Sequence, residues 1–333
     1  MKRLGRRDCL GFGALALTGL SGARAAAQPQ PAALVPDSAT LLLPGPEGGA
    51  AAQWAQGVAT GLARGLPHAV ALRSLVLGGP DGITAANRFA TMEGGDGRVL
   101  LVMPGSAAHA RLIGESRAQF DPEGWLPICV SWQGALLAGR GPWPPTGGRP
   151  LRLALPAPDA PETAALLALD LLGHPAVPIF NLAGPAAAAA IAAGEADALV
   201  IAAPSALRRA AAMGLTGWLE LEVPGRRDHP ELPSTAEASA RPVPLAAAEA
   251  GFAALRLRAA LMLQRLTSAD VVAAWRRAAL RWQEDESHQP AETTALALVG
   301  AEARSLTAAL TPPAPAVLAY REWLLRRLGF QAA

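Results

Sequence analysis

Apolar runs separated by small-residue turns organise the first two thirds of the chain. Residues 39–43 end in three consecutive leucines, which predicts a buried strand. Pro44 cannot donate a backbone hydrogen bond, and the glycines after it tolerate almost any backbone angle, so the strand must end there in a sharp turn. Residues 50–66 then place Trp54 and further apolar residues four positions apart, which predicts a helix. Strand, turn and helix form the first half of a βα unit.

The same order recurs along the chain and predicts an α/β fold of two lobes. The further strands are expected at 69–77, 98–103, 128–132, 135–138, 151–155, 177–181, 198–202 and 218–223, and the helices between them at 83–93, 108–113, 162–172, 186–193 and 205–213. Residues 139–150 are rich in Gly and Pro, which predicts a domain crossing. The first lobe is expected to comprise 36–143 plus 224–333, and the second lobe 148–223. Helices at 268–283, 293–310 and 314–328 are expected to pack back on the first lobe.

The first 27 residues have the three parts of an export signal peptide. A basic start precedes the apolar run 10–20, and the segment ends in the small-residue patterns Ala23-Arg24-Ala25 and Ala25-Ala26-Ala27. The apolar run is too short to span a bilayer, so we expect no membrane span after the signal is removed. Arg6 and Arg7, followed by Asp8 and Cys9, resemble a twin-arginine signal with Cys9 in place of the usual Phe. The choice between the general and the twin-arginine export routes stays open.

The composition excludes several classes of partner and of chemistry. The formal net charge of +2 for 333 residues becomes −2 without residues 1–27, so no basic field is left to attract nucleic acid. Cys129 is then the one remaining cysteine, and its apolar neighbours predict a small buried side chain rather than a nucleophile. The five histidines show no metal-ligand spacing and no Gly-x-Ser-x-Gly motif occurs, so we predict neither a metal nor a catalytic residue.

Five short segments, in this order, resemble a known family. Residues 120–128 are similar to its "YDPxxDFxPI" segment, and the weaker matches lie at 43–49, 100–106, 193–197 and 232–238. On these segments the chain resembles the Bug-type periplasmic solute receptors of tripartite tricarboxylate transport systems, over residues 39–330. The resemblance implies a two-lobed periplasmic binding protein fold, type II-like, with the ligand cleft between the lobes. It also implies a monomer in the periplasm.

The function that the resemblance implies is binding without reaction or cofactor. A small, carboxylate-bearing solute would be held between the lobes and passed to the membrane permease subunits of a tripartite transporter. Backbone N–H groups suit this task because they supply donors without a buried cation. The candidate contacts lie at turns after strands or at helix starts: Pro46, Glu47, Gly48, Gly49, Ser106, Ala107, Ala108, Asp159, Thr163, Gly184, Pro185, Ala186 and Ser205. Each could equally be an ordinary turn or cap residue.

Departures from the family pattern bear on the ligand. Residues 50–52 are alanines where the family usually has an Asp, and residues 159–163 replace its Ser-Pro-Ser-His loop. If the carboxylates of Glu47 and Asp159 both pointed inward, they would repel a bound anion. This leads to the hypothesis that the ligand is neutral, zwitterionic or cationic. The alternative is that both side chains point to water at the tips of loops.

Two other functions stay open. The chain could be a secreted α/β enzyme with its catalytic groups on the same turns. It could also be a receptor-fold protein that has lost its solute and acts as a sensor or interaction partner, and the missing Asp and Ser/His residues support that alternative.

Overall fold

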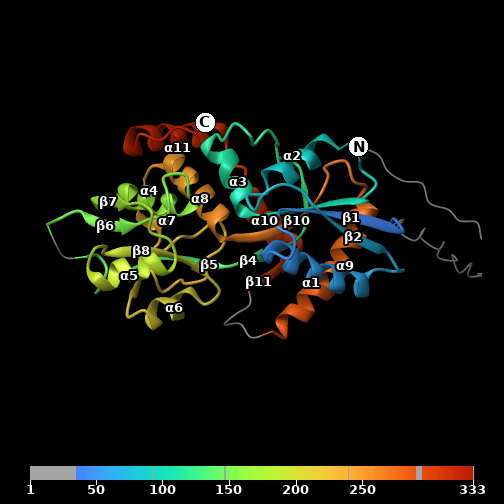
Figure 1. Cartoon of the computed structure of the whole chain (residues 1–333), viewed down its shortest axis with the longest axis horizontal. Coiled ribbons are helices and arrows are strands. Elements are labelled where there is room, and N and C mark those ends of the chain that lie inside the picture. The colour runs from blue at the N-terminus through green and yellow to red at the C-terminus, as the bar shows by residue number, and fades with distance from the viewer. Residues whose placement is uncertain (1–34, 93, 146–147, 239, 290–294, 333) are drawn as a thin grey trace, which may run out of the picture. The chain divides into compact units, whose positions relative to one another are not determined.

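The computed structural model describes residues 35–92, 94–145, 148–238, 240–289 and 295–332. The predicted signal peptide lies outside these ranges. Within them, no helix combines the length and the apolar character that a membrane crossing requires. The described chain forms two β-sheets with helices on both faces of each (Figure 1).

The first lobe is built on a six-stranded sheet in the order β11-β4-β10-β3-β1-β2. Its strands are β1 (Ser38–Leu43), β2 (Ala71–Val76), β3 (Val99–Met103), β4 (Leu126–Trp132), β10 (Leu257–Leu263) and β11 (Leu296–Val299). The three leucines of β1 are buried, as their run predicts. β10 is antiparallel to both β3 and β4, so β3 and β4 point the same way. Their carboxyl ends therefore meet at one edge of the sheet, as do those of parallel β1 and β2.

The second lobe is built on a five-stranded sheet in the order β7-β6-β8-β5-β9. Its strands are β5 (Gly134–Gly139), β6 (Leu151–Ala154), β7 (Ala176–Ile179), β8 (Ala198–Ala203) and β9 (Thr216–Glu220). β6 is parallel to β7 and β8, whereas β5 is antiparallel to β8 and β9. Gly134 pairs with Ala203, so the start of β5 lies beside the end of β8.

The helices divide between the two faces of the sheets. One face is covered by α2 (Ile83–Thr91), α3 (Gly105–Ile113), α4 (Ala164–Leu171), α8 (Pro242–Arg256), α10 (Gly300–Ala308) and α11 (Ala314–Leu328). The opposite face carries α1 (Ala50–Gly65) and α9 (Ala269–Ser287) on the first sheet, and α5 (Pro185–Ala193) and α6 (Ala206–Ala212) on the second. A short helix, α7 (Thr235–Ala238), and a 3₁₀ turn at Pro161–Thr163 complete the described helices.

The apolar core is continuous on one side of the lobes and divided on the other. Leu101 of the first sheet and Leu153 of the second belong to one cluster of buried residues. Helix α8 packs against both α3 and α4, so this cluster runs from one lobe into the other. On the opposite face, the residues under α1 and α9 form a second cluster, and those under α5 and α6 form a third. The lobes are therefore fused through side chains on the α8 face and separate on the α6 face.

Helix α11 reinforces the fused side by binding both lobes. Arg321 donates hydrogen bonds to the carbonyls of Leu112 (3.0 Å) and Arg111 (2.8 Å), at the end of α3. Two and six residues later, Trp323 (2.9 Å) and Arg327 (3.1 Å) donate to the carboxylate of Asp170 on α4. A single helix thus ties the end of α3 in the first lobe to α4 in the second.

Three features differ from the sequence-based expectations. β5, which precedes the expected crossing at 139–150, pairs in the second sheet, so the chain changes sheet at Gln133. The pattern predicted no element between 238 and 267, where the structure has α8 and β10. The helix expected at 293–310 begins as strand β11, which pairs with β4 before α10 starts. β10 and β11 are both defined by long-range pairing with β4, which local periodicity does not encode.

Two glycines of α1 predict opposite effects of the same substitution. A Cβ added at Gly61 would lie 2.6 Å from Cβ of Trp282 on α9, whereas one added at Gly57 meets no atom within 4 Å. We expect Gly57→Ala to stabilise the protein by about 0.5–1 kcal/mol through helix propensity. Gly61→Ala should destabilise it by about 1–3 kcal/mol, because α1 and α9 must move apart. Urea unfolding of both variants measures the difference, and equal effects at the two sites would contradict the close α1–α9 contact.

Candidate functional site

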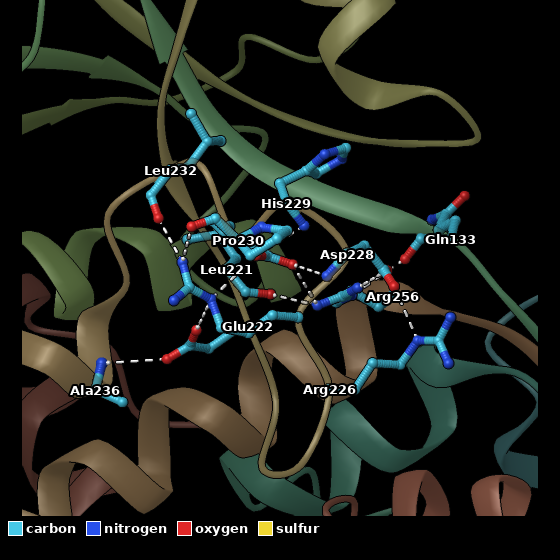
Figure 2. A network of polar contacts seen from close by, with 12 residues as sticks. Gln133, Leu221, Glu222, Arg226, Asp228, His229, Pro230, Leu232, Ala236 and Arg256 are labelled. Atoms are coloured by element: carbon cyan, nitrogen blue, oxygen red, sulfur yellow. Dashed lines mark hydrogen bonds and ion pairs between the residues drawn. The ribbon is translucent and has the colours of Figure 1, made fainter.

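The two lobes are joined where the chain crosses between the sheets, and a buried arginine lies at this junction. Gln133 links β4 to β5, and Leu221 follows β9 on the way back to the first lobe. Arg256, the last residue of α8, is fully buried. Its guanidinium donates to the carbonyls of Gln133 (3.1 Å) and Leu221 (3.1 Å) and to the carboxylate of Asp228 (Figure 2). One side chain therefore holds both crossing segments.

One buried and one partly buried carboxylate balance the charge of this arginine. Glu220 is fully buried, lies 3.7 Å from Arg256, and accepts the backbone N–H groups of Asp228 (2.6 Å) and His229 (3.1 Å). Burial lowers the pKa of Arg256, and the charges of Asp228 and Glu220 oppose that shift. The guanidinium also lies 5.1 Å from the ring centre of Trp132, a cation–π distance. We call Gln133, Glu220, Leu221, Asp228 and Arg256 the crossing network.

A cavity of about 840 Å³ lies between the lobes, directly against the crossing network. Its walls are the end of β4 and start of β5, the turn after β8, the loop 226–229, the end of α9 and the start of β11. The first sheet contributes the carboxyl end of β4, and the second contributes that of β8. Open α/β sheets characteristically bind ligands at such ends. We call this space the interlobe cavity, and it lies on the face where the cores of the lobes are separate.

Acidic and polar side chains share the lining of the interlobe cavity with apolar ones. Its charged residues are Arg226, Asp228, Glu284 and Glu286. Arg226 is already paired with Asp228 (2.9 Å) and with Glu302 (3.4 Å). The cavity therefore has no cation that is unpaired within the described part of the chain, whereas its carboxylates are in excess.

Two other cavities lie away from this junction. One of about 400 Å³ adjoins β6 in the second lobe, and one of about 730 Å³ lies between the end of α3 and α11. Arg149 and Arg152 in the smaller cavity both pair with Asp197 at 2.8 Å, and the pairing lowers the pKa of that carboxylate. Neither cavity lies at the carboxyl ends of strands from both sheets.

Among the predicted contact residues, Ser205 lines the interlobe cavity. Its backbone is left-handed, with φ 53°, directly between β8 and α6. The other predicted contacts are not among the residues that line this cavity. Their exposure ranges from fully exposed to buried: Pro46, Glu47, Gly48, Gly49, Ser106, Ala107, Ala108, Asp159, Thr163, Gly184, Pro185 and Ala186. Glu47 and Asp159 are both exposed, as the alternative of loop-tip carboxylates predicts.

Several backbone donors that the resemblance assigns to a solute are used within their own turns. The N–H of Gly49 is bonded to the carbonyl of Pro46 (3.0 Å), that of Ala107 to Pro104 (3.2 Å), and that of Ala186 to Ala183 (3.0 Å). The hydroxyl of Thr163 donates to the carbonyl of Ala157 (2.9 Å). These groups act as turn residues here, and their role as ligand contacts remains a prediction.

Sequence reasoning missed the residues that form most of the interlobe cavity. Arg226, Asp228 and His229 lie in a polar, proline-broken segment without periodicity, and Glu286 lies in a charged run at the end of α9. The charged run Glu284–Glu286 was the available signal, but by sequence it indicates a solvated helix end. Within the described residues, no group of His, Cys, Asp or Glu has the arrangement needed to hold a metal ion.

A second buried polar group lies on the fused side. His109 of α3 is buried, and both its ring nitrogens lack a hydrogen-bond partner among the described residues. Its ring centre lies 6.1 Å from that of Tyr320 on α11, whose hydroxyl also lacks a partner there. Burial lowers the pKa of His109 to about 4, and the nearby backbone of Asp159 opposes this shift only partly. Burial and the charge of Glu162 raise the pKa of Tyr320.

Comparison with known proteins identifies the fold. No protein-family model and no curated protein matches the chain. Its structure is similar to that of a TctC solute-binding protein from Polaromonas, with a TM-score of 0.64 and 16% identity, over 87% of this chain and 98% of that one. It is also similar to an R. palustris protein solved with adipate, with a TM-score of 0.52 and 16% identity, over 90% and 99% of the two chains. The predicted two-lobed α/β periplasmic binding protein fold is confirmed.

Replacement of Arg256 tests the crossing network. Arg256→Met should destabilise the protein by about 3–5 kcal/mol, because fully buried Glu220 would lose its buried cation and Asp228 would keep only its pairing with Arg226. Arg258→Met is the matched control, since Arg258 is exposed two residues later on β10, and should change stability by at most about 0.5 kcal/mol. Urea unfolding of the two variants measures both effects. A loss below about 1 kcal/mol for Arg256→Met would show that the network does not hold the crossing.

The pKa of His109 predicts a loss of stability in acid. The unfolded chain takes up a proton at this histidine near pH 6.5, whereas the folded protein does so near pH 4. The contribution of neutral His109 is therefore complete above pH 6.5, and up to about 3 kcal/mol is lost as the pH falls to 4. His109→Phe should remove that part of the pH dependence of unfolding, while His68→Gln, at an exposed site, should not. An unchanged pH slope in His109→Phe would contradict the burial of His109.

Proposed function

We propose that this protein is an extracytoplasmic solute-binding receptor that holds a small, carboxylate-bearing metabolite in the interlobe cavity. The observation that carries the proposal is a cavity of about 840 Å³ where the carboxyl ends of β4 and β8 face each other from two sheets. This volume suits a small metabolite. The fold shared with a solute-binding protein supports the same function.

The finer assignments follow from the motif order and the fold. We propose that the chain is a divergent Bug-type receptor which delivers its solute to the permease subunits of a tripartite tricarboxylate-type transporter. Residues 1–27 would direct export to the periplasm, and the twin-arginine pattern at Arg6 and Arg7 would make the folded protein the exported form. The structure solved with adipate supports a solute with a carboxylate at one end at least.

One observation favours the enzyme alternative enough to test it. Ser205 follows a strand in a left-handed turn and lines the same cavity as His229, whose Nδ1 lies 3.4 Å from the carboxylate of Glu231. A serine, a histidine and a carboxylate are the components of a nucleophilic site. Ser205 also engages partners of its own, and we propose that it orients a bound solute without reaction.

The test is a binding screen of the purified protein against mono-, di- and tricarboxylates, amides and amino acids. We expect a raised melting temperature with a subset of carboxylate-bearing compounds, confirmed by calorimetry at one site per chain, because a ligand that binds only the folded state stabilises it. Ser205→Ala should weaken binding by about 2- to 10-fold, the typical loss for one hydrogen bond. Ser116→Ala, at a position outside the interlobe cavity, is the control.

Two results would contradict the proposal. Steady hydrolysis of model esters or amides that stops in Ser205→Ala would make the protein an enzyme. Flat calorimetry across the whole library, together with recovery of a partner protein by pull-down, would favour a receptor fold that has lost its solute.

A further inference from the structure

The interlobe cavity has the chemistry of an ammonium site. We infer that its solute is zwitterionic, with a primary ammonium group held by Glu286 and Ser287 of α9 and a carboxylate at its other end. The inference rests on the proposed function and adds the class of ligand. It depends on which groups in the cavity accept hydrogen bonds, which donate them, and which are already paired.

Glu286 is the acidic group that remains unpaired in the cavity. The other two lining carboxylates have cations: Asp228 is held by Arg226 and Arg256, and Glu284 lies 2.6 Å from Arg281. Glu286 is partly buried and has no ion-pair or hydrogen-bond partner among the described residues. A bound cation would give this carboxylate the partner that it lacks within the described chain.

Neighbouring groups add acceptors rather than donors. Ser287, the next residue of α9, donates its hydroxyl proton to the carbonyl of Glu284 (2.6 Å), so its oxygen is left with lone pairs for a ligand. His229 lines the cavity with Nδ1 3.4 Å from the carboxylate of Glu231, and in the tautomer with its proton on Nδ1 the Nε2 atom is an acceptor. A primary ammonium group has three donors and no acceptor, which matches such a lining.

Trp132 and Arg226 are lining residues that carry donors for the other end of the ligand. Trp132 is fully buried, lines the cavity, and its indole N–H has no hydrogen-bond partner among the described residues. An indole N–H can only donate, so an acceptor from the ligand would satisfy it. Arg226 also lines the cavity, but its charge is shared between Asp228 and Glu302. One carboxylate fits here.

A plain dicarboxylate fits the cavity poorly for the same reasons. Its second carboxylate would lie near Glu284 and Glu286 with no unpaired cation between them, and like charges in a partly buried site repel. The sequence suggested a zwitterionic or cationic ligand through Glu47 and Asp159, but these exposed carboxylates do not line the interlobe cavity. The residues that favour an ammonium group are therefore those of α9.

Three five-carbon probes of matched length test the inference by calorimetry on the full chain. They are glutarate with two carboxylates, 5-aminopentanoate with one carboxylate and one ammonium, and 1,5-diaminopentane with two ammonium groups. We expect 5-aminopentanoate to bind at least about tenfold more tightly than either of the others, because a charge-assisted hydrogen bond is gained at one end without repulsion at the other. This comparison on the unmodified chain does not depend on any variant folding.

Glu286→Gln identifies the residue. The substitution should weaken the binding of 5-aminopentanoate at least about tenfold, and the binding of glutarate should stay unchanged or become tighter. Glu322→Gln on the exposed face of α11, outside the cavity, is the matched control and should change neither. Melting curves without ligand show whether the variants fold.

The outcomes separate the inference from the proposed function. Glutarate binding as tightly as 5-aminopentanoate, or equal loss of both in Glu286→Gln, overturns the ammonium site and leaves the receptor function standing. If 5-aminopentanoate does not bind but another compound of the library does, the ammonium site is likewise overturned and the receptor function stands. No binding by any probe or library compound overturns both.

Discussion

The structure depends on the hydrogen bonds and ion pairs of the buried Arg256. A guanidinium with no solvent exposure is stable only where its charge is matched and its N–H groups are used, and here Glu220, Asp228 and two crossing carbonyls meet both needs. The consequence is geometric. Because the same side chain binds the segment after β4 and the segment after β9, it fixes how the two sheets meet and so where Trp132, Asp228 and His229 face the interlobe cavity.

The two sides of the junction differ in what they permit. On the α8 face, one apolar cluster and helix α11 bind the lobes together. On the α6 face, the cores are separate and the interlobe cavity lies between them. Any closing motion of the lobes must therefore pivot on the α8 face and change the width of the cavity on the α6 face, as hinge closure around a ligand requires.

The sequence predicted the fold well because its signals are local. Three leucines before Pro44, and small residues after each parallel strand, define βα units whatever their partners. The residues that line the interlobe cavity were mostly not predicted, because that cavity is not local in the sequence. Ser205 is the predicted contact that lines the cavity, whereas the turns at Gly49, Ala107 and Ala186 lie elsewhere and their role as ligand contacts stays a prediction. Asp228 and Glu286 reach the cavity through strand pairing and α9 packing, which no single segment encodes.

The central claim is that a solute occupies the space between the lobes beside the crossing network. A crystal structure of the protein with a compound that it binds in solution tests this claim most directly. The account predicts one molecule between Trp132, Ser205 and Glu286, with any nitrogen toward α9. A molecule held instead by the turns at residues 46–49 and 184–186, with the interlobe cavity filled only by water, would contradict it.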